Sequence, residues 1–405
     1  MIERTDYLKK LISWKDHQVI KVITGMRRIG KSTLLLQFQE YLKENGVSEK
    51  NIISMNFEDL AYQDKLDYKA LYDDIVEKLV PGEMTYIFLD EIQHVDSFEK
   101  AVDSLYIKPN VDIYITGSNA YLLSSEISTL LSGRFVEIDM LPLSFKEFMQ
   151  NRNTDSEKGL AEYLKLGGLP YISVMNLSED MTDDYLEGIY NTVIVKDIEE
   201  REKRRETESK KRRVTDLGLL KSISRYLCSV IGSPVSTKSI TDYLKSNGRK
   251  VSANTVDDYL EVLTETYLLY PVPRFDIIGK TLLNSNMKYY TVDLGIRNHI
   301  LPRERYDLGF SLENIVYLEL KRRGYRINIG KNGNTEVDFV AEKGSILTYF
   351  QVKANMTAEE TFEREMRPLR NIKDNYRKIV LTSDRLTTGN YEGIEVINLI
   401  DWLLE

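Results

Sequence analysis

Short apolar runs alternate with amphipathic segments along the first 140 residues. Residues 33–44 (TLLLQFQEYLKE) repeat apolar side chains with helical spacing directly after the first loop. Strands that alternate with helices favour a parallel sheet covered by helices, so this part is predicted to be an α/β domain. Buried strands are predicted at 18–24 (QVIKVIT), 51–57 (NIISMNF), 86–91 (YIFLDE) and 112–116 (DIYIT).

The middle of the chain is predicted to be mostly helical. Residues 142–208 have helical periodicity that is interrupted at Gly167-Gly168-Leu169-Pro170. Three further helices are predicted between 217 and 267, with Gly248 as a stop signal and Ser252 as an N-cap. Residues 268–283 (LLYPVPRFDIIGKTLL) then favour two short strands. Three helices followed by a two-stranded wing are typical of a winged-helix domain.

The last third of the chain returns to a mixed pattern. Residues 311–324 predict an amphipathic helix that ends at Gly324. Alternating apolar and polar residues predict three strands at 325–331, 335–343 and 346–355. A strand–strand–helix pattern after residue 378 completes a second α/β domain.

Composition narrows the classes of function. The 405 residues include 55 basic and 63 acidic side chains, for a net charge of −8. No run approaches the roughly 18 apolar residues that span a bilayer, and MIERTDYLKK is charged from its third residue, unlike a secretory signal. The single cysteine, Cys228, fits a reducing compartment, and three scattered histidines argue against a Cys/His zinc site. We expect a cytoplasmic protein without a membrane partner.

A phosphate-binding motif follows the first predicted strand. The motif GxxxxGK[ST] lies between a strand and a helix, which is the setting that it requires. Backbone N–H groups of such a loop and the helix N-terminus attract phosphates. We expect Lys31 to reach the β- and γ-phosphates of ATP and the Ser32 hydroxyl to ligate Mg²⁺. The expected ATP-binding residues are Gly25, Met26, Arg27, Arg28, Ile29, Gly30, Lys31, Ser32 and Thr33, with Arg27 and Arg28 facing either phosphate or solvent.

Two carboxylates follow a later strand of the same region. Asp90 ends the apolar run and is expected to hold Mg²⁺, while Glu91 can polarise the attacking water as a general base. The strand 112–116 leads into Ser118 and Asn119, either of which can orient that water. An extra strand between the loop and the Asp-Glu pair is typical of the P-loop class that includes AAA-plus ATPases.

Several motifs then occur in a characteristic order: TGMRRIGKST, MNFED, FLDEIQ, ITGSNA, LLSGR, LPLSFKEF, LGGLP and VIVKDI. Together they resemble prokaryotic AAA-plus ATPases that carry a C-terminal domain of unknown function related to restriction-type nucleases. The resemblance covers essentially the whole chain. It implies that Arg134 is an arginine finger for a neighbouring subunit of a homo-oligomer, although a surface arginine can also stand there. It also implies that Asn56 restrains Glu91 until a ligand binds.

Pattern and resemblance together predict four regions. They are a P-loop AAA-plus ATPase core at 1–140, a helical lid and linker at 141–208, a winged-helix domain at 209–285, and a restriction-endonuclease-like α/β domain at 286–405. The fold class is therefore α/β.

The middle of the chain is the predicted place for a DNA partner. Residues 196–285 hold 17 basic and 13 acidic residues within an acidic protein. The run 201–213 (REKRRETESKKRR) can be a solvated linker or an arm that contacts phosphate. Asp257 and Asp258 would repel DNA, and winged helices also dock proteins, so both kinds of partner stay open. The side chains expected to face DNA are Arg249, Lys250, Asn254 and Thr255.

Two adjacent strands of the last region converge polar side chains. Asp338 lies on the face of TEVDF that is opposite the apolar side chains of that strand. Gln351 and Lys353 lie on the corresponding face of YFQVK. The set resembles PD-(D/E)xK nucleases, in which these positions and Glu313 on the preceding helix would hold Mg²⁺ and activate water. Gln351 replaces the usual acid, which should weaken Mg²⁺ binding. Cleavage and a degenerate fold kept for binding both stay open.

Three functions compete on these grounds. The first is an Mg²⁺-dependent ATPase that moves its C-terminal domains on a partner such as DNA. The second is an ATP-regulated DNA nuclease, and the third is a nucleotide-controlled switch that docks proteins.

Overall fold

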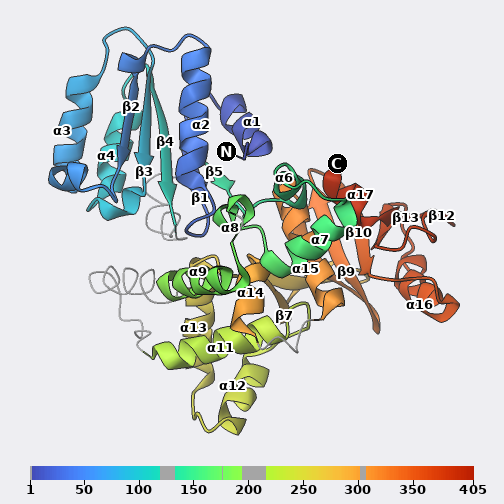
Figure 1. The fold of residues 1–405 in the computed structure, drawn as a ribbon. Coiled ribbons are helices and arrows are strands. Elements are labelled where there is room, and N and C mark those ends of the chain that lie inside the picture. Colours follow the sequence, from blue (N-terminus) through green and yellow to red (C-terminus); the bar gives the residue numbers. More distant parts are fainter. Residues whose placement is uncertain (1, 119–132, 176, 194–215, 302–306) are drawn as a thin grey trace. The chain divides into compact units, whose positions relative to one another are not determined.

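The computed structural model describes residues 2–118, 133–175, 177–193, 216–301 and 307–405 (Figure 1). The chain divides into two compact units, Met1–Met140 with Glu265–Tyr267, and Leu141–Thr264 with Leu268–Glu405. In the part of the chain that the structure describes, no helix combines the length and apolar character needed to cross a membrane.

The first unit is built on a five-stranded parallel sheet with the order β2-β3-β4-β1-β5. Its fully buried strands β1 and β3 consist mainly of apolar residues, as expected for a parallel sheet covered on both faces. The predicted α/β class with a parallel sheet is confirmed. The strands are β1 Ile20–Thr24, β2 Ile52–Asn56, β3 Thr85–Asp90, β4 Val111–Gly117 and β5 Phe135–Asp139.

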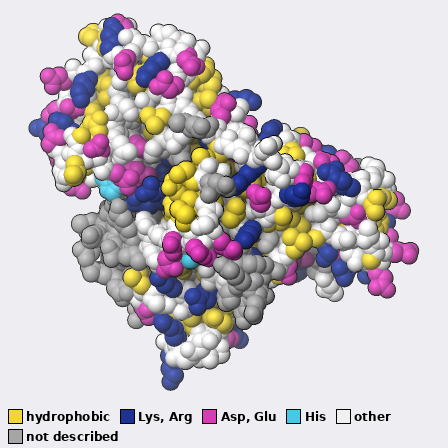
Figure 2. Space-filling view, in the orientation of Figure 1, with side chains coloured by type: hydrophobic (Ala, Val, Ile, Leu, Met, Phe, Trp, Pro, Cys, Tyr) yellow, Lys and Arg dark blue, Asp and Glu magenta, His cyan; other side chains and the backbone are white. Residues whose placement is uncertain are grey.

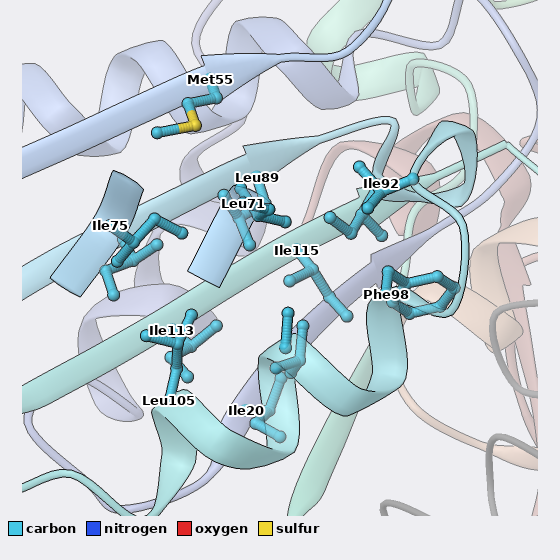
Figure 3. Close-up of a cluster of buried hydrophobic side chains, with 14 of the residues drawn as sticks. Ile20, Met55, Leu71, Ile75, Leu89, Ile92, Phe98, Leu105, Ile113 and Ile115 are labelled. Carbon is cyan, nitrogen blue, oxygen red and sulfur yellow. The ribbon is translucent and has the colours of Figure 1, made fainter. Parts of the chain in front are cut away.

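Helices cover both faces of this sheet. Phe38 of α2 (Lys31–Glu44) packs against Phe88 and Tyr114 on one face. On the other face, α3 (Tyr68–Lys78) and α4 (Phe98–Tyr106) enclose the apolar cluster shown in Figure 3. This core fixes the strand ends at which the expected site residues lie. The unit also contains α1 Thr5–Ser13 and the 3₁₀ turns η1 Glu49–Asn51, η2 Leu60–Lys65 and η3 Ile92–His94.

The second unit holds an eight-stranded mixed sheet with the order β12-β13-β11-β10-β9-β8-β6-β7. Helix α15 packs on β7 to β10, and α16 packs on β9, β10 and β13. The strands are β6 Leu269–Asp276, β7 Thr281–Thr291, β8 Arg326–Asn332, β9 Thr335–Lys343, β10 Ile346–Lys353, β11 Arg377–Thr382, β12 Gly389–Tyr391 and β13 Ile394–Asn398.

The helices of the second unit follow the predicted lid, the three middle helices and the last region. They are α6 Phe145–Met149, α7 Ser156–Leu166, α8 Pro170–Val174, α9 Glu179–Asn191, α11 Leu217–Ser229, α12 Thr237–Ser246, α13 Ala253–Glu265, α14 Leu294–Ile300, α15 Leu308–Arg322, α16 Glu359–Arg370 and α17 Leu399–Leu404.

The two strands expected as a wing belong to the large sheet. β6 and β7 pair as an antiparallel hairpin, but β6 also pairs in parallel with β8. The ladder joins residues 274–276 of β6 to residues 329–331 of β8, and it covers an edge that an isolated wing would leave exposed. The boundary expected after residue 285 falls inside β7. The three helices α11 to α13 are present, and the winged-helix assignment itself stays a prediction.

The LGGLP motif connects the lid helices to the last region of the second unit. The Gly168 N–H donates to Asp293 Oδ2 at 2.6 Å, and Asp293 also caps α14 by accepting from the Ile296 N–H at 3.1 Å. A Cβ at Gly295 would lie 2.2 Å from the Leu166 carbonyl oxygen. Burial raises the pKa of Asp293 to about 6, although these backbone N–H groups oppose the shift.

Candidate nucleotide-binding site

The predicted phosphate-binding loop joins β1 to α2 in the first unit. Gly25 has φ +137°, and a Cβ there would lie 2.3 Å from the Met140 carbonyl oxygen, so a glycine is required. Gly30 precedes α2 with φ +98° and Arg28 also has a positive φ of 67°. The side chains of Met26 and Ile29 are buried in the core. These two residues can therefore offer only backbone N–H groups to a phosphate.

Lys31 lies inside this loop. Its Nζ donates to the carbonyl oxygens of Gly25 at 3.1 Å and Met26 at 3.2 Å, and it lies 3.3 Å from Glu91 Oε1. The side chain is almost fully buried. A phosphate entering the loop would offer the ammonium stronger, charged acceptors than these two carbonyls.

Asp90 and Ser32 bring oxygen ligands together at the carboxyl ends of the strands. The Asp90 carboxylate accepts hydrogen bonds from the hydroxyls of Ser32 and Thr116. Burial raises the pKa of Asp90, while the two hydroxyls oppose that shift. A carboxylate beside a hydroxyl is a donor set that suits Mg²⁺, which prefers hard oxygen ligands. The residues present therefore fit the expected ion.

Glu91 takes a backbone conformation that non-glycine residues rarely adopt, with φ +52°. Its N–H donates to Thr116 Oγ1 at 2.9 Å, which holds the turn after β3 in place. Burial alone would raise the pKa of Glu91, but the Lys31 charge and a hydrogen bond from Gln93 hold it below its ordinary value. The carboxylate is therefore ionised at neutral pH, as a general base must be.

Gln93 is a residue to which the sequence analysis assigned no role. Its Nε2 donates to Glu91 Oε2 and also lies 3.4 Å from Ser118 Oγ. Gln93 thus bridges the expected base and one of the two candidates for orienting water. The signal was present, because Gln93 ends the FLDEIQ motif. Asn56, to which restraint of Glu91 was assigned, accepts instead from the Glu58 N–H at 2.9 Å.

Three further residues of the first unit, Arg27, Thr33 and Asn119, were also expected at the site. Arg27 is buried and donates to Glu58 Oε1 at 2.8 Å, while Thr33 is half-buried on the first turn of α2. Asn119 lies outside the described residues.

Arg134 lies beside the amino-terminal end of β1, at the opposite end of the sheet from the loop. The Ile20 N–H, at the start of β1, donates to the Arg134 carbonyl oxygen at 2.7 Å, whereas the loop follows the end of β1. Five strand residues span roughly 16 Å between these two edges. The guanidinium hydrogen-bonds Asp103 and lies 5.5 Å from the centre of the Tyr106 ring. Arg134 therefore does not serve the loop of its own chain.

The C-terminal positions that resemble a nuclease are gathered in the second unit. Glu313 of α15 accepts from Lys288 Nζ at 3.0 Å and from the Tyr290 hydroxyl at 2.5 Å. Lys288 also lies 2.8 Å from Glu336 Oε1. Burial raises the pKa of Asp338 well above its ordinary value, and the nearby Glu313 charge adds to the shift. Lys288 was not predicted to belong to this group, since it precedes Glu313 by 25 residues on a different element.

The remaining two positions of that pattern pair with α16. Gln351 Nε2 donates to Glu365 Oε2 at 3.1 Å, and Lys353 Nζ lies 3.3 Å from Glu365 Oε1. Neither pairing was predicted, because no helix was expected at residues 359–370.

Some polar side chains of the region expected to face DNA form ion pairs or hydrogen bonds with other side chains of the same unit. Arg249 lies 3.1 Å from Asp216 Oδ2, and Asp257 accepts from Thr237 Oγ1 at 2.6 Å. Lys250 and Asn254 are exposed, and the Thr255 N–H donates to Ser252 Oγ, which confirms the expected cap. On the face shown in Figure 2, Lys and Arg side chains of the described residues lie among Asp and Glu side chains.

Comparison with known families agrees with the class that this fold and loop define, a P-loop domain of the AAA type. Residues 17–149 match the family described as "AAA domain". Residues 157–307 and 308–402 match two domains of unknown function, DUF8612 and DUF4143.

Two relatives match almost the whole chain. An uncharacterized protein of Haemophilus influenzae is 41% identical over 411 residues, covering 100% of this chain and 99% of the relative. Uncharacterized protein MJ1544 of Methanocaldococcus jannaschii is 33% identical, covering 94% and 85%. The chain belongs to the family of these proteins. Among solved structures, the Walker-type ATPase PABY2304 of Pyrococcus abyssi is 16% identical with a TM-score of 0.48, covering 74% of this chain and 96% of that chain.

Proposed function

We propose that this protein is an Mg²⁺-dependent ATPase. The observation that carries the proposal is the convergence of Lys31, Asp90 and Glu91 at the carboxyl ends of β1 and β3, where the ligands of P-loop domains bind. Gly25 to Thr33 bind the phosphates of ATP, with Lys31 on the β- and γ-phosphates. Ser32 and Asp90 hold Mg²⁺, which neutralises charge that develops on the phosphate oxygens.

The protein's own residues supply the base and its positioning. Glu91 accepts the proton of the attacking water, and Gln93 holds the carboxylate through its Oε2. Ser118 and Asn119 are the candidates for orienting that water. Since Lys31 lies 3.3 Å from Glu91 in this structure, the base is paired with a cation until a phosphate draws the ammonium away.

Completion of the site by a second copy is part of the proposal. Arg134 lies at the edge of the sheet opposite its own loop, so as an arginine finger it serves a neighbouring subunit of a homo-oligomer. Hydrolysis moves the helical lid (141–208), the winged helix (209–285) and the C-terminal domain (286–405).

DNA is the partner that we propose for the moving domains. The mildly basic composition of residues 196–285 and the exposed Lys250 and Asn254 support this choice. The alternative is a switch in which the same helices dock a protein.

ATP turnover of matched variants tests the proposal. Lys31→Ala should abolish both ATP binding and phosphate release, because it removes the cation expected to contact the β- and γ-phosphates. Lys43→Ala, an exposed position near the end of α2, should leave both unchanged. Absence of phosphate release from the wild type would refute the ATPase, and full activity in Lys31→Ala would refute the role of this loop. Adding single- and double-stranded DNA at low salt tests the partner: unchanged turnover without binding favours the switch.

A further inference from the structure

The nuclease-like site of the second unit contains the ammonium group of a lysine side chain, Lys288. Lys288 enters from β7 and is almost fully buried. Its Nζ lies 3.0 Å from Glu313 Oε1 on α15 and 2.8 Å from Glu336 Oε1 on β9. The resemblance to PD-(D/E)xK nucleases would place a divalent cation among these acidic groups. Here the ammonium bridges two carboxylates from different elements.

The oxygens expected to ligate that cation are also engaged. The β9–β10 ladder ends at the pair Phe339 and Phe350, which leaves a gap in the backbone pairing at Asp338 and Gln351. Two side chains bridge the gap: the Asp338 N–H donates to Gln351 Oε1 at 3.3 Å, and the Val352 N–H donates to Asp338 Oδ2 at 2.8 Å. A metal that took either oxygen would compete with a buried backbone N–H group.

Lys353, the lysine expected to activate water, pairs with a carboxylate of α16. Lys353 Nζ lies 3.3 Å from Glu365 Oε1, and Glu365 also accepts from the Gln351 amide. Within the described ranges, no group of three or more His, Cys, Asp or Glu side chains has the geometry to hold a metal ion. The donor set therefore does not fit the ion that the resemblance implies.

We infer that Lys288 takes the place of the divalent cation, so that the C-terminal domain is a non-cleaving module held together by an internal ion-pair network. Lys288, Glu313 and Glu336 join β7, α15 and β9, three elements that are distant in sequence. The ammonium supplies these acidic groups with a fixed positive charge, whereas a metal would leave and return. This inference is independent of the ATPase, since it concerns the second unit alone.

Binding of Mn²⁺ to the nucleotide-free full-length chain, followed by electron paramagnetic resonance, tests the inference. The parent protein in this experiment carries Ser32→Ala, which weakens the proposed ATPase metal site. All other variants are made in this parent. The parent and its Asp338→Asn derivative should bind the same number of Mn²⁺ ions. Lys288→Met should gain one ion, because Glu313 and Glu336 lose their internal cation. Lys343→Met, an exposed lysine at the end of β9, should gain none.

A parent protein that binds an Mn²⁺ ion lost in Asp338→Asn would overturn the inference. Mn²⁺-dependent nicking of plasmid DNA that disappears in Asp338→Asn would do so as well. Should Lys288→Met fail to fold, the comparison of the parent with Asp338→Asn still decides. A folded Lys288→Met that binds no additional ion would refute the claim that the ammonium excludes the metal.

Discussion

Lys31 Nζ lies 3.3 Å from Glu91 Oε1 in the first unit, with both side chains almost fully buried. One cation thus contacts the loop carbonyls and the carboxylate that we propose as the base. A phosphate in the loop competes for the same ammonium. Binding of ATP would then release Glu91 from its ion pair, which links occupancy of the loop to activation of the base.

Replacing Glu91, the acidic partner of this ion pair, should separate ATP binding from ATP hydrolysis. Glu91→Gln removes the base but keeps the loop, so ATP binding should persist while turnover falls by about 10²- to 10⁴-fold. Fluorescent-nucleotide binding and phosphate release measure the two effects. Glu40→Gln, an exposed position on α2, is the control. If Glu91→Gln turned over ATP at the wild-type rate, another group would be the base.

Gln93 should act as a positioning residue for Glu91. Gln93→Ala removes a hydrogen bond that lowers the pKa of Glu91, so that pKa should rise. The acidic limb of the kcat profile should then move to higher pH, with kcat reduced by roughly tenfold and KM little changed. Gln63→Ala, an exposed glutamine on η2, should have the wild-type profile. A changed KM with an unmoved limb would indicate a structural role instead.

Local sequence signals predicted the fold of the first unit well because its strands and loop lie in short motifs, and the candidate site residues lie in the same motifs. The strand–loop–helix around Lys31 and the carboxylates after β3 are each contiguous, so spacing alone identifies them. Contacts between distant elements were missed. Lys288 reaches Glu313 only through the packing of β7 on α15.

Two elements show why the second unit was harder to predict. The hairpin β6–β7 was expected as a wing because two short strands follow three helices, and its pairing with β8 is not encoded locally. Helix α16 had a usable signal in Phe362, Met366 and Leu369, which repeat with helical spacing, but Pro368 and many charges obscured it.

Arg134 should act on the active site of a neighbouring copy. Arg134→Ala and Glu91→Gln should each be nearly inactive alone. Their equimolar mixture should recover about a quarter of wild-type turnover, because a quarter of interfaces then combine an intact base with an intact finger. Mixing Lys31→Ala with Glu91→Gln, which both damage the same site, should recover none. Absence of recovery in the first mixture would rule out action in trans.

Asp293 should make the second unit less stable as pH rises from about 4 to 6. The folded-state pKa of about 6 lies above the ordinary value of 3.8. The unfolded chain therefore loses this proton first, and deprotonation disfavours the folded state within that window. Relative to Asp293→Asn, which cannot titrate, the free energy of unfolding should fall by up to about 3 kcal/mol and then level off above pH 6.

Trp402, buried in α17, reports on the unfolding of this unit once Trp14, the other tryptophan, is replaced by Phe. Asp155 provides a control of opposite sign, because its hydrogen bonds to Lys158 lower its pKa. Stability relative to Asp155→Asn should therefore rise with pH and level off near pH 4. A difference between wild type and Asp293→Asn that stayed constant from pH 4 to 7 would show that Asp293 is ionised throughout. Its contact with Gly168 would then be a hydrogen bond to a full carboxylate charge.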